Sequence, residues 1–155
     1  MKLKKDKAYS FVEVILIVMI ISIFAVVAVP RFNRGSILEN NAEAAARKIV
    51  TDLRLARRLA ISDAANNTEG FELKMVGSSP YTGYEIENAD TEETYASHTL
   101  DSGINISCPA GTSFIFGPLG NLITGSGNSI IVSAEGKSFT ITIVPTTGIV
   151  KCIEN

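Results

Sequence analysis

The sequence predicts an α+β protein: a long N-terminal helix, apolar in its first half and amphipathic in its second, followed by an antiparallel β domain. Three observations lead to this prediction. From Val14 to Val29 only Ser22 is polar. Between residues 40 and 65, strong helix formers dominate and few helix breakers occur. After Gly70, short apolar stretches alternate with turn residues, a pattern typical of strands.

The length of 155 residues suits one domain plus an anchor. Apolar residues make up 46% of the chain and charged residues 19%, and the apolar excess lies near the start. The formal net charge is -2. Removal of residues 1–8 would take away four lysines and one aspartate, which leaves a charge of -5. A mildly acidic mature chain has no electrostatic reason to bind nucleic acid or anionic lipid.

The N-terminal segment decides the class of protein. Residues 1–8, MKLKKDKA, are short and basic, and residues 9–30 form an apolar run in which Glu13 is the sole charge. That run is about the length that a helix needs to cross the hydrocarbon core of a bilayer. Four lysines precede it, whereas only Arg31 and Arg34 follow closely, so the N-terminus is expected in the cytoplasm and the C-terminal part outside.

Three interpretations of this segment compete. The first is a secretory signal peptide, with Val26 and Ala28 as the small residues before its cut. The second is an uncut single-span anchor. Neither gives a reason for Glu13 at the start of the apolar run. The third is a cut between Ala8 and Tyr9 that keeps the helix, so that Glu13 becomes the fifth residue of the mature chain and Pro30 the twenty-second.

The third interpretation resembles the type IV prepilin signal: a basic leader, a small residue, an aromatic residue, and the run FVEVIL. Ala8 stands where that signal usually has glycine, and Tyr9 replaces the usual phenylalanine. The resemblance implies cleavage after Ala8 by a prepilin peptidase and methylation of the Tyr9 amine. It also implies that Glu13 pairs with the N-terminal amine of a neighbouring subunit during assembly. Pro30 would interrupt helical hydrogen bonding and belongs to the same assembly segment.

Residues 31–66 are predicted to form the amphipathic, soluble part of the helix. Ile49, Leu53, Ala56 and Ala60 recur on one helical face, and Asn66, Asn67 and Gly70 are expected to end the helix. The charged residues lie largely off that face, and they include Arg47, Lys48, Asp52, Arg54 and Arg58. We expect Arg47 to pair with Glu43, and Lys48 with Asp52, at helical spacing.

Residues 67–155 are predicted to form an extracytoplasmic β domain. The strands are expected at residues 71–76, 83–87, 104–108, 113–117, 129–134, 139–144 and 149–153. Residues 117–127, GPLGNLITGSG, are expected to be a loop. A helix followed by an antiparallel β domain resembles the pilin architecture, in which the β domain packs on the soluble half of the helix.

Cys108 and Cys152 both lie outside the apolar run. Their pairing would suit an oxidising compartment and would stabilise the fold by about 2–4 kcal/mol. Two buried reduced thiols are the alternative, because sequence does not supply the separation of the two Cα atoms.

No motif predicts catalysis or a cofactor. His98 is the only histidine, which leaves no catalytic triad to argue, and it is expected on a solvated strand or loop. No phosphate-binding loop, H-E-x-x-H or C-x-x-C motif occurs. Acidic residues between 85 and 101 cluster loosely, without the spacing of a calcium loop, and are expected to form a solvated edge. We therefore expect no enzyme, no metal site and no cofactor.

Two further segments, LRLARRLAIS (53–62) and FIFGPLGN (114–121), resemble the H-type minor pseudopilins of the GspH/FimT family, as do the last two predicted strands. The resemblance implies a subunit of a type II secretion pseudopilus in the inner membrane, with its C-terminal domain in the periplasm and other pilins or pseudopilins as partners. The alternative is a FimT-like minor pilin that serves pilus assembly or DNA uptake. The basic residues of the soluble helix would suit DNA, but the acidic mature chain and the tail, KCIEN, argue against nucleic acid as a partner.

Overall fold

The computed structural model describes residues 10–28, 34–109, 111–125 and 127–155. The chain divides into two compact units, residues 1–34 and 35–155. In the first unit the described residues form helix α1 (Phe11–Ala28). The second unit contains all the described strands and helix α2 (Arg34–Ser62), except for its first residue, which is assigned to the first unit. The predicted processing residues Ala8, Tyr9 and Pro30 lie outside the described residues.

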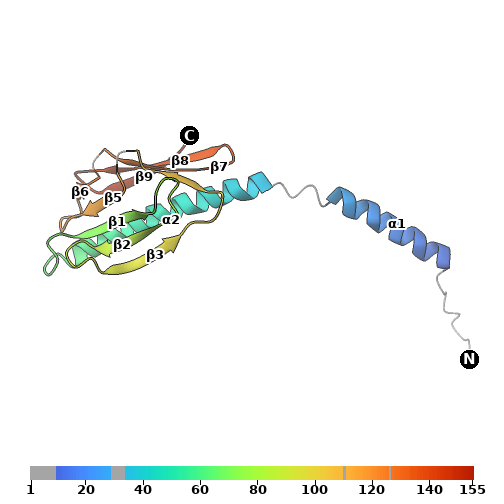
Figure 1. Cartoon of the computed structure of the whole chain (residues 1–155), viewed down its shortest axis with the longest axis horizontal. Coiled ribbons are helices and arrows are strands. Elements are labelled where there is room, and N and C mark those ends of the chain that lie inside the picture. Colours follow the sequence, from blue (N-terminus) through green and yellow to red (C-terminus); the bar gives the residue numbers. More distant parts are fainter. Residues whose placement is uncertain (1–9, 29–33, 110, 126) are drawn as a thin grey trace, which may run out of the picture. The chain divides into compact units, whose positions relative to one another are not determined.

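The second unit contains two antiparallel sheets (Figure 1). The first has five strands in the order β3-β2-β1-β5-β6, and the second has four in the order β4-β7-β8-β9. The strands are β1 (Phe71–Val76), β2 (Gly83–Asn88), β3 (Thr94–Thr99), β4 (Asn105–Ser107), β5 (Ser113–Phe116), β6 (Leu122–Thr124), β7 (Ser129–Ala134), β8 (Lys137–Val144) and β9 (Ile149–Glu154). The Leu122 amide donates to the Pro145 carbonyl at 2.8 Å and joins the two sheets at one end.

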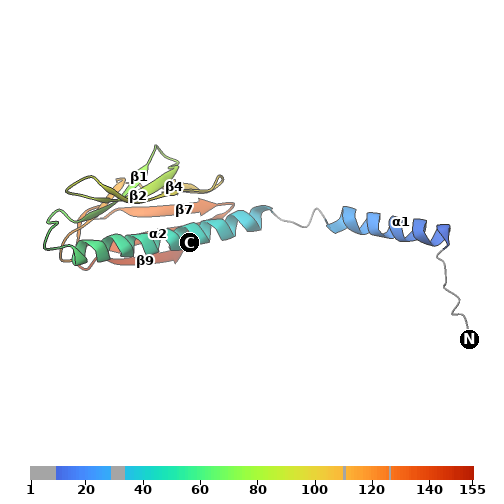
Figure 2. The same cartoon turned by 90° about the horizontal axis from the view of Figure 1, so that it is seen from below.

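Helix α2 packs against both sheets and has strand β9 along one side, as Figures 1 and 2 show. Ile49, Leu53, Ala56 and Ala60 are all fully buried, which confirms the predicted apolar face. The helix ends at Ser62, and the amides of Asn66 and Asn67 both donate to the Asp63 carbonyl, so a tight turn replaces the last residues of the predicted helix.

The core lies between α2 and the inner faces of the two sheets. In β1 every second side chain is buried, and in β7 the same alternation holds, as expected of strands with one face on a core. The largest fully buried apolar side chains come from α2 and from both sheets: Ile49, Leu53, Leu73, Ile86, Ile106, Phe114, Phe116, Ile130, Val132 and Ile141. The predicted α+β class is therefore confirmed for this unit.

Seven strands lie where the sequence predicts them, with ends that differ by at most two residues, and two strands were not predicted. Strand β3 lies in the region of acidic residues that was expected to form a solvated edge, and β6 lies inside the segment 117–127 that was expected to be a loop. Both are edge strands of the five-stranded sheet. An edge strand has only one neighbour and buries less of its surface, so its sequence shows a weaker alternation of apolar and polar residues.

Candidate assembly surfaces

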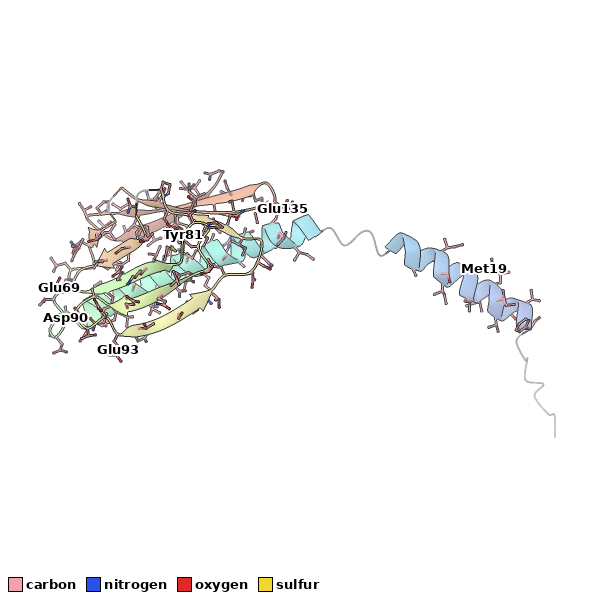
Figure 3. The ribbon with its side chains drawn as sticks, viewed as in Figure 1. Met19, Glu69, Tyr81, Asp90, Glu93 and Glu135 are labelled. Atoms are coloured by element: carbon pink, nitrogen blue, oxygen red, sulfur yellow. The ribbon has the colours of Figure 1, made fainter. Side chains whose placement is uncertain are left out.

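Helix α1 presents an apolar surface that no other described part of its unit covers. Every described side chain from Ser10 to Ala25 is exposed. One stripe of this surface consists of Val14, Ile15, Val18, Met19, Ser22 and Ile23, and Figure 3 labels Met19 on it. The Ser22 hydroxyl donates to the Val18 carbonyl at 2.8 Å. This internal bond satisfies the only hydroxyl of the stripe, so the surface needs no polar partner there.

Glu13 lies in the first turn of α1, where the helix begins at the Ser10 carbonyl. That carbonyl accepts the amides of Glu13 at 2.9 Å and Val14 at 3.2 Å. A carboxylate in the first turn is favoured by the positive end of the helix dipole. Within the residues that the structure describes, no cation pairs with Glu13.

One finding bears on the predicted span at residues 9–30. Among the described residues, no helix combines the length and the apolar character that crossing a membrane requires.

A buried polar cluster fixes α2 to the five-stranded sheet. The Tyr84 hydroxyl donates to Asp52 Oδ2 at 2.6 Å, and His98 Nε2 lies 3.4 Å from the same oxygen. The rings of Tyr84 and His98 lie 5.3 Å apart between centroids. Burial, together with the hydrogen bond to Asp52, raises the pKa of Tyr84 above its usual range. The hydroxyl therefore stays protonated and remains a donor to the carboxylate.

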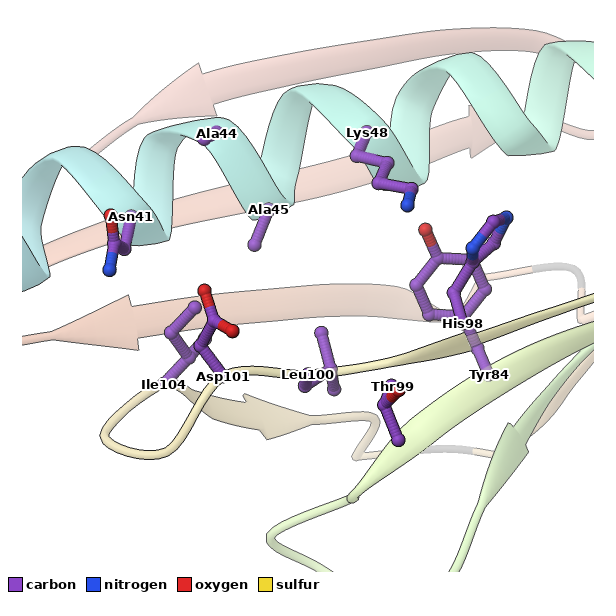
Figure 4. A pocket seen from close by; sticks show the side chains of 10 residues that line it. All are labelled: Asn41, Ala44, Ala45, Lys48, Tyr84, His98, Thr99, Leu100, Asp101 and Ile104. Atoms are coloured by element: carbon purple, nitrogen blue, oxygen red, sulfur yellow. The ribbon is translucent and has the colours of Figure 1, made fainter.

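This cluster borders a groove of about 270 Å³ between α2 and the end of β3 (Figure 4). Lys48 and Ala45 lie on its helix side, and His98 and Asp101 lie opposite. Figure 4 shows the Tyr84 hydroxyl pointing toward the helix beside the His98 ring. Because the Tyr84 hydroxyl and the Asp52 carboxylate satisfy each other, the cluster is arranged to hold the helix on the sheet.

Two expectations about this region were wrong. His98 lies on a strand, β3, which was one of its two expected positions, but its side chain is only 27% exposed and lies beside Asp52 of the helix rather than in solvent. Lys48 was expected to pair with Asp52, but Asp52 turns inward to Tyr84 and its side chain is 10% exposed. The other expected pair is confirmed, because Arg47 and Glu43 form an ion pair at 2.7 Å.

A second groove, of about 440 Å³, lies between α2 and the start of β9. We call it the basic groove, and its lining residues are Thr51, Arg54, Arg57, Arg58, Gly148, Ile149 and Val150. Arg57 Nε donates to the Gly120 carbonyl at 2.9 Å, which ties the helix to the turn between β5 and β6. Gly148 has φ +63° and packs so closely on that carbonyl and on Arg57 that a Cβ would clash with both. Glycine at this position lets the three segments meet.

The two cysteines do not come together, and both are free thiols. Cys108 follows β4 and is buried, whereas Cys152 lies exposed on β9. Strands β4 and β9 form opposite edges of the four-stranded sheet, with β7 and β8 between them. Three strand spacings amount to about 14 Å, beyond the roughly 7 Å limit for Cα atoms of a disulfide. The sheet order therefore rules against the predicted pairing within one chain.

The loose acidic cluster resolves into the tip between β2 and β3. Asp90, Glu92 and Glu93 are exposed there, as Figure 3 shows for Asp90 and Glu93. Among the described residues, no group of three or more potential ligands is arranged to hold a metal ion.

Sequence reasoning missed that Asp52 is buried against Tyr84, because Asp52 was counted among the charged residues off the apolar face. The spacing contained a signal, since Asp52 stands three residues after Ile49 and four before Ala56, both buried. For Tyr84, on β2, nothing in the sequence indicated a partner on the helix. Its partner on the helix is identified only once the strands are arranged into a sheet.

No protein-family model and no curated protein sequence matches the chain. Among solved structures, the chain is similar to the crystal structure of the type IV minor pilin FimU from Pseudomonas aeruginosa, with a TM-score of 0.58 and 15% sequence identity. The match covers 72% of this chain and 91% of FimU. A helix packed on antiparallel sheets with this likeness shows that the protein has a pilin-like fold.

Proposed function

We propose that the protein is a structural subunit of a pilin-like filament and has no catalytic role. The observation that carries this proposal is the combination of a pilin-like domain with a helix, α1, whose described apolar side chains are all exposed. Such a surface is unfavourable in water, because burying apolar surface contributes about 25 cal/mol per Å². A lipid phase before assembly and a bundle of subunit helices after assembly would both cover it.

The processing steps complete the proposal. A prepilin peptidase cuts between Ala8 and Tyr9, and the segment 9–30 holds the subunit in the inner membrane with the domain in the periplasm. The new Tyr9 amine of one subunit then pairs with Glu13 of its neighbour. The support is the sequence signal and the exposed position of Glu13 on an apolar helix. A carboxylate in apolar surroundings is costly without a partner, so the pair would form only in the docked register.

The narrower proposal is a minor pseudopilin of a type II secretion system, which follows from the resemblance of segments 53–62 and 114–121. A minor pilin of a type IV pilus is the second candidate. The likeness to FimU, at 15% sequence identity, supports the pilin-like fold that both candidates share. Tagged protein captured from cross-linked cells separates the two, since mass spectrometry of the co-isolated subunits identifies either secretion or pilus components.

Two measurements test the filament proposal. The intact mass of the membrane-extracted protein should correspond to a chain that starts at Tyr9, with or without a methyl group. The variant Glu13→Ala should be inserted and cut normally but should enter filaments poorly, whereas Glu13→Asp, which keeps the carboxylate, should retain most of the assembly. Normal co-assembly of Glu13→Ala would contradict the pairing of amine and carboxylate. A chain that starts at Val29 would contradict the filament role itself.

A further inference from the structure

The basic groove carries positive charge that the described part of the chain does not neutralise. Arg54 and Arg58 are exposed and form no ion pair with any described residue. Arg57 lines the same groove and donates to the Gly120 carbonyl at 2.9 Å. Ile149, half exposed, adds an apolar contact at the groove wall. Arginine beside an exposed apolar side chain is a composition typical of protein interfaces.

The acidic tip, which we define as Asp90, Glu92 and Glu93, carries the opposite charge. All three residues are exposed, and none has a cationic partner among the described residues. Lys74, on β1, forms an ion pair with Glu87 at 3.4 Å rather than with a residue of the tip. On β3, Tyr95 follows the tip closely and is 59% exposed. The tip therefore offers three carboxylates and an aromatic ring to a partner.

The acidic tip is held rigidly on the domain. Asn88 Oδ1 accepts the amide of Asp90 at 2.9 Å and that of Thr91 at 3.3 Å. The buried Asn67 donates from Nδ2 to the same oxygen at 2.9 Å and to the Gly70 carbonyl at 2.7 Å. These bonds connect the tip to the segment that follows α2. A preorganised loop loses little conformational freedom on binding, which favours its use as a docking element.

The two surfaces lie on different sides of α2. The basic groove is formed with β9. The acidic tip instead leads into strand β3, whose far end lines the other groove of the helix with His98. A surface on one side that is complementary to a different surface on the other side makes a heterologous contact. Repetition of such a contact produces a helical array rather than a closed dimer.

We propose that the basic groove of one copy binds the acidic tip of a second copy of this chain in the filament. This inference rests on the proposed filament function and specifies which surfaces of neighbouring domains meet. Arg54 and Arg58 then bind carboxylates of the tip, and Tyr95 packs near Ile149. The contact steers association by charge, so it weakens with rising salt.

Zero-length cross-linking in cells that produce the full chain tests this contact. A carbodiimide joins a carboxylate to a lysine amine, but not to arginine, so Arg58→Lys places a reactive amine in the groove while keeping its charge. The expected product is a dimer whose linked peptides join residue 58 to Asp90, Glu92 or Glu93. Arg47→Lys is the matched control, because Arg47 lies on the same helix but outside the groove lining, and it should give no link to the tip.

Charge reversal gives a second readout. Arg58→Glu alone and Glu93→Arg alone should each lower the co-isolation of tagged and untagged copies by about tenfold, and the two together should restore it, because they exchange the partners. Absence of the linked peptide, or single variants that co-isolate normally, would overturn the proposal. Loss of duplex DNA binding in Arg58→Glu with unchanged co-isolation would also overturn it and assign the groove to nucleic acid.

Filament entry, measured in the same cells, separates this inference from the proposed function. If the chain enters filaments without the linked peptide, the docking contact is wrong and the filament function stands. If linked dimers form but the chain never enters filaments, the filament function is wrong and the docking contact stands.

Discussion

Helix α1 and the unit of residues 35–155 differ in whether their apolar side chains are buried. In the larger unit, apolar side chains of α2 and of both sheets close on one another, and residues such as Leu53 and Phe114 are fully buried. In α1, every described apolar side chain remains exposed, Phe24 at 69%. The first region is stable by its own packing, whereas the second needs a partner to cover it. A substitution in the larger unit should therefore impair folding, whereas a substitution in α1 should impair its contact with a partner.

The largest contrast is expected between two identical substitutions, one in each region. Phe114→Ala removes a fully buried ring and should lower the free energy of unfolding of the domain by about 3–5 kcal/mol. Phe24→Ala removes an exposed ring from α1 and should leave that free energy unchanged. Denaturant titration followed by circular dichroism measures both. Equal losses would show that α1 packs on the domain and would remove the contrast.

A smaller effect is expected at the polar cluster that fixes α2. Tyr84→Phe removes the hydroxyl that donates to Asp52 and leaves a buried carboxylate without that donor, so it should lower the free energy of unfolding by about 1.5–3 kcal/mol. Tyr95→Phe makes the same change on an exposed ring and should change stability by less than about 0.5 kcal/mol. Similar values for the two variants would show that the cluster does not hold the helix.

The buried thiol gives a prediction about pH. Burial raises the pKa of Cys108 to about 11, so the folded state keeps a proton that the unfolded chain releases from about pH 8.5. The stabilisation is complete below that pH and is lost as the pH rises toward 11. Between pH 8 and pH 11 the wild type should therefore lose up to about 2 kcal/mol more stability than Cys108→Ala. Tyr84 also titrates at high pH, but it is present in both proteins and cancels. Parallel pH profiles would contradict the burial of Cys108.

The smallest effect on stability is expected from the last test, which compares the chemical labelling of the two thiols. Burial raises the pKa of both cysteines, but only Cys152 is exposed. Iodoacetamide should label Cys152 in the folded protein and Cys108 only after unfolding, because the reagent needs both access and thiolate. The intact mass before labelling should show two reduced thiols. A mass about 2 Da lower, together with a lack of labelling at both residues, would instead show that Cys108 and Cys152 form a disulfide, contrary to the sheet order.

Much of the larger unit could be predicted from sequence because its elements bury one regular face. Strand β7, with every second residue buried, was predicted to the residue, and so was β1. The strand β3 was missed because its exposed and half-buried residues leave no apolar face to recognise. The fate of Asp52 was missed because helical spacing alone does not tell which partner a carboxylate meets. That partner, Tyr84, is set by the sheet arrangement.

The internal hydrogen bond of Ser22 affects how precisely a neighbouring helix can be positioned along the axis of α1. Its hydroxyl donates to the Val18 carbonyl within the same helix. Apart from Glu13, the surface from Phe11 to Ala25 therefore offers no polar group to an adjoining helix. Dispersion forces along such a surface change little when one helix slides past another by a turn. Glu13 is the single charged residue on this surface, and in the proposed filament its pairing with the amine of a neighbour would fix the axial position of the helix. Axial alignment of the whole assembly would then depend on one carboxylate per subunit, while the rest of the helix tolerates sliding.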